Sequence, residues 1–374
     1  MVNVLHYLSG LADIKAGVET YILNLYDRLD KEEYSFSILT RNAKQDSPLY
    51  ELFVEHGIKV YEISFPSLNV TNTLLFKKEL NRFFEKIDLQ FDFLHMHGCD
   101  DPFVVECAKK HGIKVAAVHV HSIVRENKNV IKRYIKTYTS RNNIRYSDYL
   151  FACSNDAGKS MFKDRPYEVL KNSIDTQKFK FDAQKREELR EKYHIDEHMQ
   201  VIGYCGRFSE IKNLPFLLEV FMYVRKKKNE TILIMIGNGE CKSELVDLAK
   251  KFDIEKCVIF TGEIENVNEL LSAMDLYLQT SIKEGFSISA LEAQCNGLKT
   301  VISSGFPKEI EITDLVKRIP LEYSPEDWSV SVCALLDSEQ NNRATYATRI
   351  KEAGYDSGES IRQISGVYRD AKND

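Results

Sequence analysis

The sequence has no long hydrophobic run. Its longest apolar stretches, such as residues 232–236, fall far short of the ~20 consecutive apolar residues that a membrane-spanning helix needs. Residues 2–8 have the composition of a β-strand and show neither a basic segment nor a small-residue cleavage site, so we expect no secretory signal. These absences predict a chain that works in the cytoplasm.

A large excess of charge of one sign is also absent. Lys and Arg number 51, whereas Asp and Glu number 56, which gives a net charge of −5. A chain this close to neutrality has no overall field that attracts nucleic acid. We therefore expect no nucleic-acid partner, and any basic surface must be local.

Paired cysteines are missing as well. The eight cysteines stand singly among apolar neighbours, and the Cys-x-x-Cys pair of many zinc and redox sites does not occur. Buried free thiols explain this pattern more simply than a disulfide framework or a metal site.

The chain does have length and a regular alternation of element types. At roughly 150 residues per domain, its 374 residues predict two domains. Short runs rich in β-branched and apolar residues alternate with amphipathic helical stretches, which is the pattern of parallel sheets covered by helices on both faces. The strands predicted for the first half are residues 2–7, 34–40, 59–63, 93–96, 114–119 and 149–153. Those predicted for the second half are residues 201–205, 231–237, 258–261, 276–279 and 300–303.

The predicted fold class is α/β, with two doubly wound, Rossmann-like domains that face each other across a cleft. A highly charged segment, residues 178–193, separates the two runs of alternation. We predict a first domain over 1–177, a second over 178–350, and a helical tail over 351–374 that is able to pack back on the first domain. Ligands of open α/β sheets bind beyond the carboxyl ends of the strands, so the site is expected in the cleft.

A glycine and two cations follow the strand predicted over residues 201–205. Gly206 and Arg207 leave this strand directly, and Lys212 precedes a helix predicted to begin near residue 214. Two positive charges and the free N–H groups of a helix N-terminus form an anion site, with a phosphate or diphosphate as the expected ligand. Taken alone, the same residues are explained equally well as a solvated loop with two exposed cations.

Two carboxylates flank the start of a later helix. Glu284 precedes the helix predicted near residue 287, and Glu292 lies at the edge of its apolar stripe. A carboxylate at the border of a core needs hydrogen-bond partners, which the hydroxyls of a sugar would supply. The alternative is that Glu284 complements the helix dipole and that Glu292 is an ordinary rim residue.

Histidines occur in pairs at the ends of two predicted strands. His95 and His97 form one pair, and His119 and His121 form the other. The i, i+2 spacing puts each pair on one face of its strand, so a metal site is conceivable. Because no clear carboxylate completes such a set, we predict no metal, and a structural role for these histidines stays open.

One local basic surface is predicted. The segment 125–145 carries seven Lys and Arg residues against one acid, and apolar residues recur in it at helical spacing. Such a helix is able to lie on an anionic membrane surface. The alternative is that the segment packs on its own domain as an ordinary amphipathic helix.

Together these motifs resemble glycosyltransferase family four, whose members are retaining enzymes with the GT-B fold. Glu284 and Glu292 look like its E-x7-E signature, and Arg207 with Lys212 looks like its diphosphate clamp. Further family motifs are similar, in the same order, to residues 16–20, 154–162, 172–175 and 324–328. The resemblance covers nearly the whole chain and is strongest for bacterial transferases that build capsular polysaccharide and exopolysaccharide.

The resemblance implies a role for each matching residue. Arg207 and Lys212 would bind the donor diphosphate and stabilise the leaving nucleotide. Glu284 would hold hydroxyls of the transferred sugar, and Glu292 those of the ribose. His121 resembles the first-domain histidine that meets the donor sugar. The other implied donor contacts are Gly17, Gly206, Ile264, Asn266, Val267, Gly285, Phe286, Ser287 and Ile288. The residues implied at the acceptor side are His97, Asp100 and His119.

The implied function is transfer of a hexose-type sugar from a nucleoside diphosphate sugar, with UDP as the expected nucleotide. The acceptor would be a glycan or lipid-linked glycan in cell-surface polysaccharide synthesis, which implies a cytoplasmic enzyme at the inner face of the membrane. No cofactor beyond the donor substrate is expected. The Asp-x-Asp metal motif of the other main glycosyltransferase fold is absent, so the reaction is expected to be metal-independent.

The sequence departs from the family pattern at Ser287, where glycine or proline is frequent, and at Ser173, where the family usually has glycine. These differences bear on sugar selectivity more than on the class of reaction. Two other functions stay open. One is a nucleotide-sugar-binding partner that assists another transferase without catalysis, and the other is a sugar-nucleotide epimerase of GT-B fold.

Overall fold

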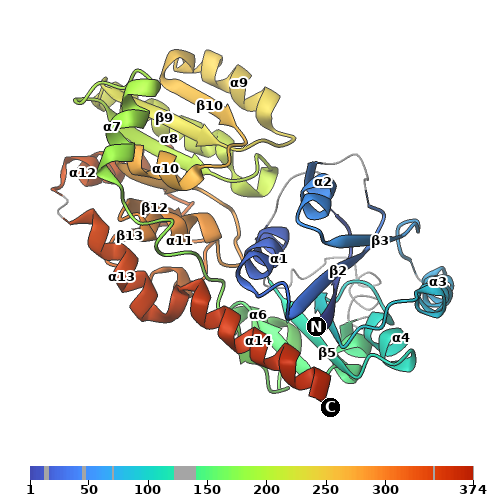
Figure 1. The fold of residues 1–374 in the computed structure, drawn as a ribbon. Helices are drawn as coiled ribbons and strands as arrows, with labels where there is room; N and C mark the ends of the chain where they lie inside the picture. Colours follow the sequence, from blue (N-terminus) through green and yellow to red (C-terminus); the bar gives the residue numbers. More distant parts are fainter. Residues whose placement is uncertain (12–16, 44–47, 70, 122–139, 340–341, 374) are drawn as a thin grey trace. The chain divides into compact units, whose positions relative to one another are not determined.

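The computed structural model describes residues 1–11, 17–43, 48–69, 71–121, 140–339 and 342–373. It divides into two compact units (Figure 1). The first unit comprises Met1–Asn172 and Gly358–Asp374, and the second comprises Ser173–Ser357. The predicted boundary, between 177 and 178, lies five residues after the end of Met1–Asn172.

The first unit is built on a seven-stranded sheet in which the strand pairs of the described residues run parallel. The strands lie in the order β3-β2-β1-β4-β5-β6-β7. Their bounds are Val2–Leu8 (β1), Tyr34–Arg41 (β2), Lys59–Ile63 (β3), Phe93–His97 (β4), Val115–Val120 (β5), Tyr149–Ala152 (β6) and Glu168–Val169 (β7). The chain starts inside the sheet at β1 and winds outwards to both edges, which is a doubly wound order.

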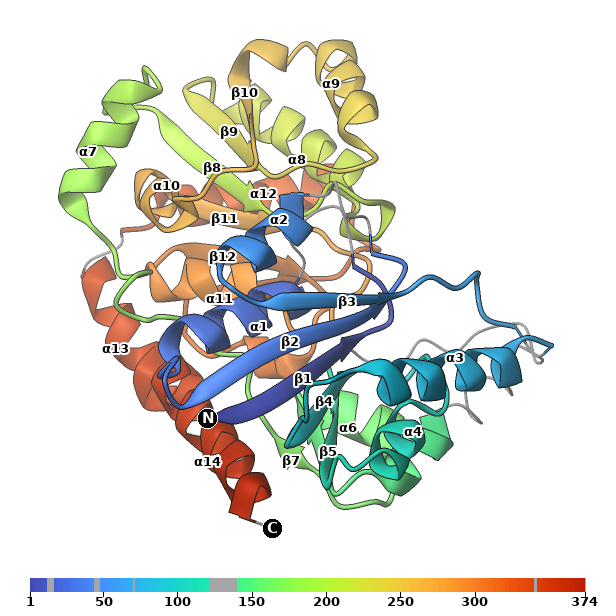
Figure 2. The same cartoon turned by 45° about the vertical axis from the view of Figure 1, so that its right-hand side comes forward.

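Helices cover both faces of this sheet (Figure 2). Those packed on one face are α3 (Thr73–Lys86), α4 (Val104–Lys110) and α6 (Asn155–Phe162). Those packed on the other are α1 (Gly17–Arg28), α2 (Pro48–Glu55) and α14 (Ser357–Asn373). Successive residues of a strand point to opposite faces, so Leu5 and Tyr7 of β1 enter the first core and Val4 and Leu8 enter the second.

The last helix, α14, joins the first unit although it is last in sequence (Figure 2). Its Ile364 and Tyr368 are buried in the same core as β1 and β2. Residues 351–357 of the predicted tail remain with the second unit, where Ile174 N–H donates to Tyr355 O at 3.1 Å.

The second unit contains a six-stranded parallel sheet in the order β10-β9-β8-β11-β12-β13. The bounds of its strands are Gln200–Cys205 (β8), Thr231–Ile236 (β9), Val258–Gly262 (β10), Leu276–Gln279 (β11), Lys299–Ser303 (β12) and Val316–Ile319 (β13). Helices again lie on both faces. The helices on one face are α8 (Leu214–Lys227), α9 (Lys242–Lys251) and α12 (Pro325–Asp337). Those on the other are α10 (Val267–Ala273), α11 (Ile288–Cys295) and α13 (Tyr346–Ile350), with α7 (Ala183–Lys192) beside α10.

The prediction of two doubly wound α/β domains is therefore confirmed. None of the helices that the structure describes is both long and apolar enough to cross a bilayer. The basic segment predicted over 125–145 lies outside the described residues as far as 139, and the chain is helical from 140 to 146. Membrane contact through this segment stays a prediction.

Candidate active site

Glu284 collects three hydrogen-bond donors on one carboxylate oxygen. Its Oε1 lies 2.5 Å from Lys212 Nζ, 2.9 Å from Gln279 Nε2 and 2.7 Å from Ser281 Oγ. The ion pair is largely buried, since 20% of the Lys212 side chain and 10% of the Glu284 side chain are exposed. Strands β8 and β11 pair in parallel, so the loops that follow them meet at one edge of the sheet. All three bonds are made to Oε1, and none of them involves the second oxygen, Oε2.

Further hydrogen bonds orient Gln279. Its side chain is fully buried, and its Oε1 accepts a hydrogen bond from Ser287 Oγ at 2.9 Å. The Tyr277 hydroxyl lies 3.2 Å from the same oxygen. Because the amide oxygen faces these hydroxyls, the amide nitrogen is turned toward Glu284.

Ser287 holds a backbone conformation that favours glycine. Its φ is 75° and its ψ is 94°, and positive φ costs a residue with a Cβ atom roughly 1–2 kcal/mol. The Ser287 hydroxyl also accepts the Ala290 N–H at 3.3 Å and so caps α11. The departure from the family pattern at this position therefore has a physical consequence, because the hydroxyl supplies two hydrogen bonds that glycine would lack.

The loops after β8 and β9 pack backbone against backbone. Phe208 N–H donates to Asn238 O at 2.8 Å. A Cβ atom on Gly237, whose φ is +131°, would lie 2.1 Å from Gly206 O, so only glycine fits there. This close approach fixes the segment that carries Arg207.

Arg207 is exposed and forms an ion pair with Glu240. Its Nη2 lies 3.1 Å from Glu240 Oε2, and 48% of the Arg207 side chain and 53% of the Glu240 side chain are exposed. Ion pairs this exposed are weak. Of the two predicted cations, the structure brings Lys212 to Glu284 and places Arg207 with Glu240.

The remaining predicted donor residues lie around α10 and α11. Glu292 is half-buried in α11, and its charge adds to the effect of burial in raising the pKa of the Cys205 thiol. Asn266 immediately precedes α10, and both Ile264 and Val267 pack partly buried against the core.

The segment between Glu284 and α11 contributes mainly backbone. The Phe286 ring is buried and stacks on Tyr355, with ring centroids 5.5 Å apart, so its side chain serves the core. Gly285 precedes it, and Ile288 is the first residue of α11. The N–H groups at this helix start are suited to an anion, and their contact with the donor stays a prediction.

In the first unit, the predicted histidines belong to a cluster of five. His6 Nδ1 lies 2.9 Å from His97 Nε2, and His97 Nδ1 lies 2.8 Å from His121 Nε2. His95 Nε2 and His119 Nδ1 are 3.2 Å apart. His6 is the only histidine in its strand, so the paired spacing that marks the other four gives no sign of it. It joins the others since β1 lies directly beside β4.

The three predicted histidines differ in how deeply they are buried. His119 is fully buried and His97 is 6% exposed, whereas His121 is half-buried just beyond the end of β5. His121 is therefore the best placed of the three to touch a ligand. Gly17 is the first residue of α1, and Asp100 is exposed. Acceptor contact by His97, Asp100 and His119 stays a prediction.

The same cluster contains two overlapping sets of potential metal ligands. Ligand atoms of His6, His95 and His97, and of His97, His119 and His121, lie within 4.8 Å of one another. Imidazole is a common ligand of Zn²⁺ and other transition metals. Both ring nitrogens of His97 face other imidazoles at hydrogen-bond distance, so a metal would have to replace those bonds.

A buried carboxylate next to Asp100 was missed. Asp101 is 2% exposed, and its Oδ2 accepts hydrogen bonds from the Tyr7 hydroxyl at 2.6 Å and from Arg41 Nε at 3.3 Å. Burial raises the pKa of Asp101 in spite of these two donors. Nothing in the sequence distinguishes it from Asp100, because both follow the same predicted strand.

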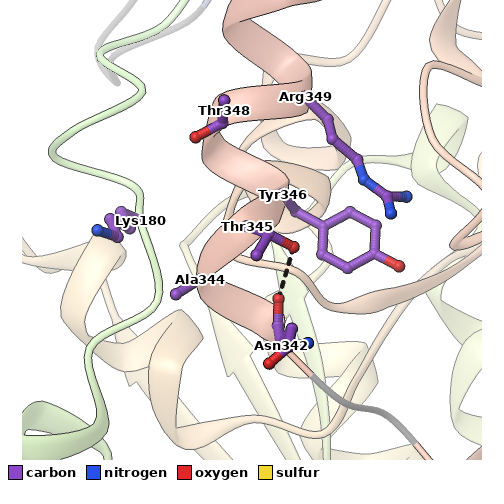
Figure 3. A pocket seen from close by; sticks show the side chains of 7 residues that line it. All are labelled: Lys180, Asn342, Ala344, Thr345, Tyr346, Thr348 and Arg349. Atoms are coloured by element: carbon purple, nitrogen blue, oxygen red, sulfur yellow. Dashed lines mark hydrogen bonds between the residues drawn. The ribbon is translucent and has the colours of Figure 1, made fainter.

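The second unit also has a pocket of about 660 Å³ (Figure 3). Its lining residues are Lys180, Asn342, Ala344, Thr345, Tyr346, Thr348 and Arg349. The Thr345 hydroxyl donates to Asn342 O at 2.8 Å, and the Arg349 guanidinium lies 4.6 Å from the centre of the Tyr346 ring. None of these residues is a predicted donor residue, so we do not assign the pocket to the donor.

Two family models match the chain. The model described as "Glycosyltransferase Family 4" matches residues 16–178, and the one described as "Glycosyl transferases group 1" matches residues 185–355. Each model thus accounts for most of one unit.

Relatives match over most of the chain's length. EpsF of Bacillus subtilis (strain 168), which carries a glycosyltransferase name, is 26% identical over 375 residues, covering 98% of this chain and 96% of EpsF. The "UDP-Gal:alpha-D-GlcNAc-diphosphoundecaprenol alpha-1,3-galactosyltransferase" of Escherichia coli is 19% identical, covering 79% of this chain and 78% of that enzyme.

A solved structure has the same fold. HepE of Anabaena, in complex with UDP and glucose, superposes with a TM-score of 0.75 at 16% identity, covering 98% of this chain and 99% of HepE. The motifs around Arg207, Lys212, Glu284 and Glu292, the two parallel sheets and the family matches agree. The chain is a glycosyltransferase and belongs to glycosyltransferase family four.

Proposed function

We propose that this glycosyltransferase moves a hexose-type sugar, with retention of anomeric configuration and without a metal ion, from a UDP-sugar to a glycan or lipid-linked glycan. The UDP and glucose bound to HepE support the choice of nucleotide and sugar class. The lipid diphosphate in the name of the E. coli relative supports the acceptor class. The proposed role is synthesis of cell-surface polysaccharide at the inner face of the membrane.

The hydrogen bonds at Glu284 carry this proposal. Three donors, one of them the Lys212 ammonium, converge on Oε1 and hold the carboxylate in one orientation. Oε2 then remains to accept hydroxyls of the transferred sugar. A carboxylate buried to this degree needs polar partners, and the three donors at Oε1 supply them to one of its two oxygens.

The proposed chemistry follows from the charges around the diphosphate. Lys212 and Arg207 stabilise the negative charge that builds on the leaving group. Since no described residue stands out as a nucleophile for double displacement, we favour attack on the face from which the diphosphate leaves. The acceptor oxygen bonds to the anomeric carbon, the bond from that carbon to the phosphate oxygen breaks, and the acceptor proton passes to the departing phosphate.

A donor-hydrolysis assay on the full-length chain tests the proposal. UDP release is measured with a panel of UDP-sugars, without acceptor, for the wild type and for Glu284→Gln. Slow release that depends on the sugar and falls at least ~100-fold in Glu284→Gln supports a transferase. Tight binding of a UDP-sugar with no turnover, even with lipid-linked glycans added, would indicate the non-catalytic partner, and conversion of the UDP-sugar to an epimer would indicate the epimerase.

A further inference from the structure

Two buried histidines, His6 and His97, form an unbroken hydrogen-bonded line with the half-buried His121. We call His6, His97 and His121 the histidine chain. It runs from β1 through β4 to the residue after β5, through the 2.9 Å contact from His6 Nδ1 to His97 Nε2 and the 2.8 Å contact from His97 Nδ1 to His121 Nε2. Each contact needs one nitrogen that donates and one that accepts. Both nitrogens of His97 are therefore committed, and His121 uses Nε2 in its contact with His97, so its Nδ1 is the nitrogen that can face a ligand.

The surroundings of the histidine chain keep it uncharged. The titratable groups that face it are His95 on β4, His119 on β5, Tyr21 on α1 and Tyr368 on α14. Burial lowers the pKa of His6 and of His121 to about 3, and it also lowers the pKa values of the other three histidines. Burial raises the pKa values of Tyr21 and Tyr368, so these phenols are neutral too.

The inner end of the histidine chain has no outlet for a proton. His6 is fully buried, and its Nε2 has no hydrogen-bond partner among the described residues. A proton taken up at His121 Nδ1 and passed inward would leave a buried imidazolium at His6, with the Phe36 ring 4.4 Å away. An uncompensated charge in such a place is strongly disfavoured. The histidine chain is built to hold His121 and not to conduct protons.

We propose that His97, backed by His6, is a positioning residue that fixes the ring and the tautomer of His121, so that His121 offers a neutral hydrogen-bonding nitrogen to the sugar and does not act as a proton acceptor. This inference rests on the proposed function, in which the departing phosphate takes the acceptor's proton. A stable core does not need imidazoles at these positions. The proposed role accounts for their presence.

The test compares two buried histidines that differ in contact with His121. His97→Ala opens a space lined by the polar nitrogens of His6 and His121, which water would fill, so the pKa of His121 should move toward its ordinary value near 6.5. The rate of UDP release by His97→Ala, relative to wild type, should then fall about fourfold between pH 8 and pH 6. His97→Asn keeps a polar atom near the former Nδ1. Its rate relative to wild type should therefore stay nearly constant between pH 8 and pH 6.

His95→Ala is the matched control. His95 is also buried, but it bonds to Tyr368 and His119 and not to His121. Its removal should lower stability, while the rate of UDP release relative to wild type should not fall at low pH. Equal pH profiles for His97→Ala and His95→Ala would overturn the proposal.

Nitrogen NMR of the imidazoles gives a second measurement that needs no activity and no mutation. In the wild type, His121 should show one dominant neutral tautomer from pH 8 down to pH 5. A ring of His121 that titrates near pH 6.5, or that averages between tautomers, would overturn the proposal even if the sugar donor were misassigned. Addition of Zn²⁺ to the same sample is a further check, because stoichiometric uptake that shifts all five rings would make the cluster a metal site instead.

Discussion

Lys212 Nζ and Glu284 Oε1 lie 2.5 Å apart in a largely buried ion pair that joins the loops after β8 and β11. The contact joins Lys212, the cation proposed to bind the diphosphate, to Glu284, the carboxylate proposed to bind the sugar. Among the described residues each of the two is the ion-pair partner of the other, so they should act as one unit.

Replacing either partner should therefore cost about as much as replacing both. We expect Lys212→Met and Glu284→Gln each to lower the rate of UDP release by at least ~100-fold, a loss typical of removing one preorganised charge-stabilising group. The double variant should lose little more, because a broken pair leaves no second effect to remove. The measurement is kcat/KM for all four proteins. Losses that multiply across the double variant would show that the two side chains work independently.

Ser287 offers a stability prediction with a definite order. Ser287→Ala keeps the unfavourable φ and loses both the cap on α11 and the bond to Gln279, so it should lower the free energy of unfolding by about 1–2 kcal/mol. Ser287→Gly loses the same bonds but relieves the backbone strain, so it should be more stable than Ser287→Ala by about 1 kcal/mol. Urea unfolding measures both changes. The reverse order would mean that the positive φ carries little strain.

The sequence predicted the strands and helices well where apolar periodicity is strong, and less well where polar contacts decide. Strand β13 was missed because Lys317 and Arg318 interrupt its apolar pattern at the edge of the sheet. The charged segment 178–193 was predicted as a boundary, yet it contains α7. Arg186 of α7 donates to backbone carbonyls at the end of α10 and pairs with Asp275 at 2.6 Å. Helical periodicity carries no sign of such contacts.

The residues of the site also differ in how far the sequence predicted them. Local motifs identified Lys212 and Glu284, and the adjacency of β8 and β11 then explains their contact. The pairing of Arg207 with Glu240 and the addition of His6 to the histidines were not predicted. Both depend on which strands are neighbours in the sheet, and the order of strands is not written in any local spacing.

The buried histidines predict a loss of stability in acid. The folded-state pKa values of His6 and His121 are about 3, whereas the unfolded value is about 6.5, so the unfolded chain binds more protons between these limits. The free energy of unfolding should not depend on these groups above pH 6.5 and should fall as the pH falls below it. At pH 5.5 each of the two should cost about 1.4 kcal/mol.

Urea unfolding at pH 7.5 and pH 5.5 checks this dependence. His6→Phe removes one of the two groups and should reduce the difference between the two pH values by about 1.4 kcal/mol. The comparison is within one variant across pH, so any packing cost of the phenylalanine cancels. An unchanged difference in His6→Phe would mean that His6 is protonated in the folded state or does not differ from the unfolded chain.

Glu240 competes with the donor diphosphate for Arg207 if the guanidinium has the proposed role. The pair is half-exposed on both sides, so it is weak and readily exchanged. Glu240→Gln should raise the affinity for UDP by about two- to five-fold, because the guanidinium no longer has to leave a carboxylate. Arg207→Gln should lower that affinity by at least tenfold, and the double variant should resemble Arg207→Gln alone. Calorimetric titration with UDP at constant ionic strength measures all three. If Glu240→Gln binds UDP more weakly than the wild type, Glu240 orients Arg207 for the diphosphate and does not compete with it.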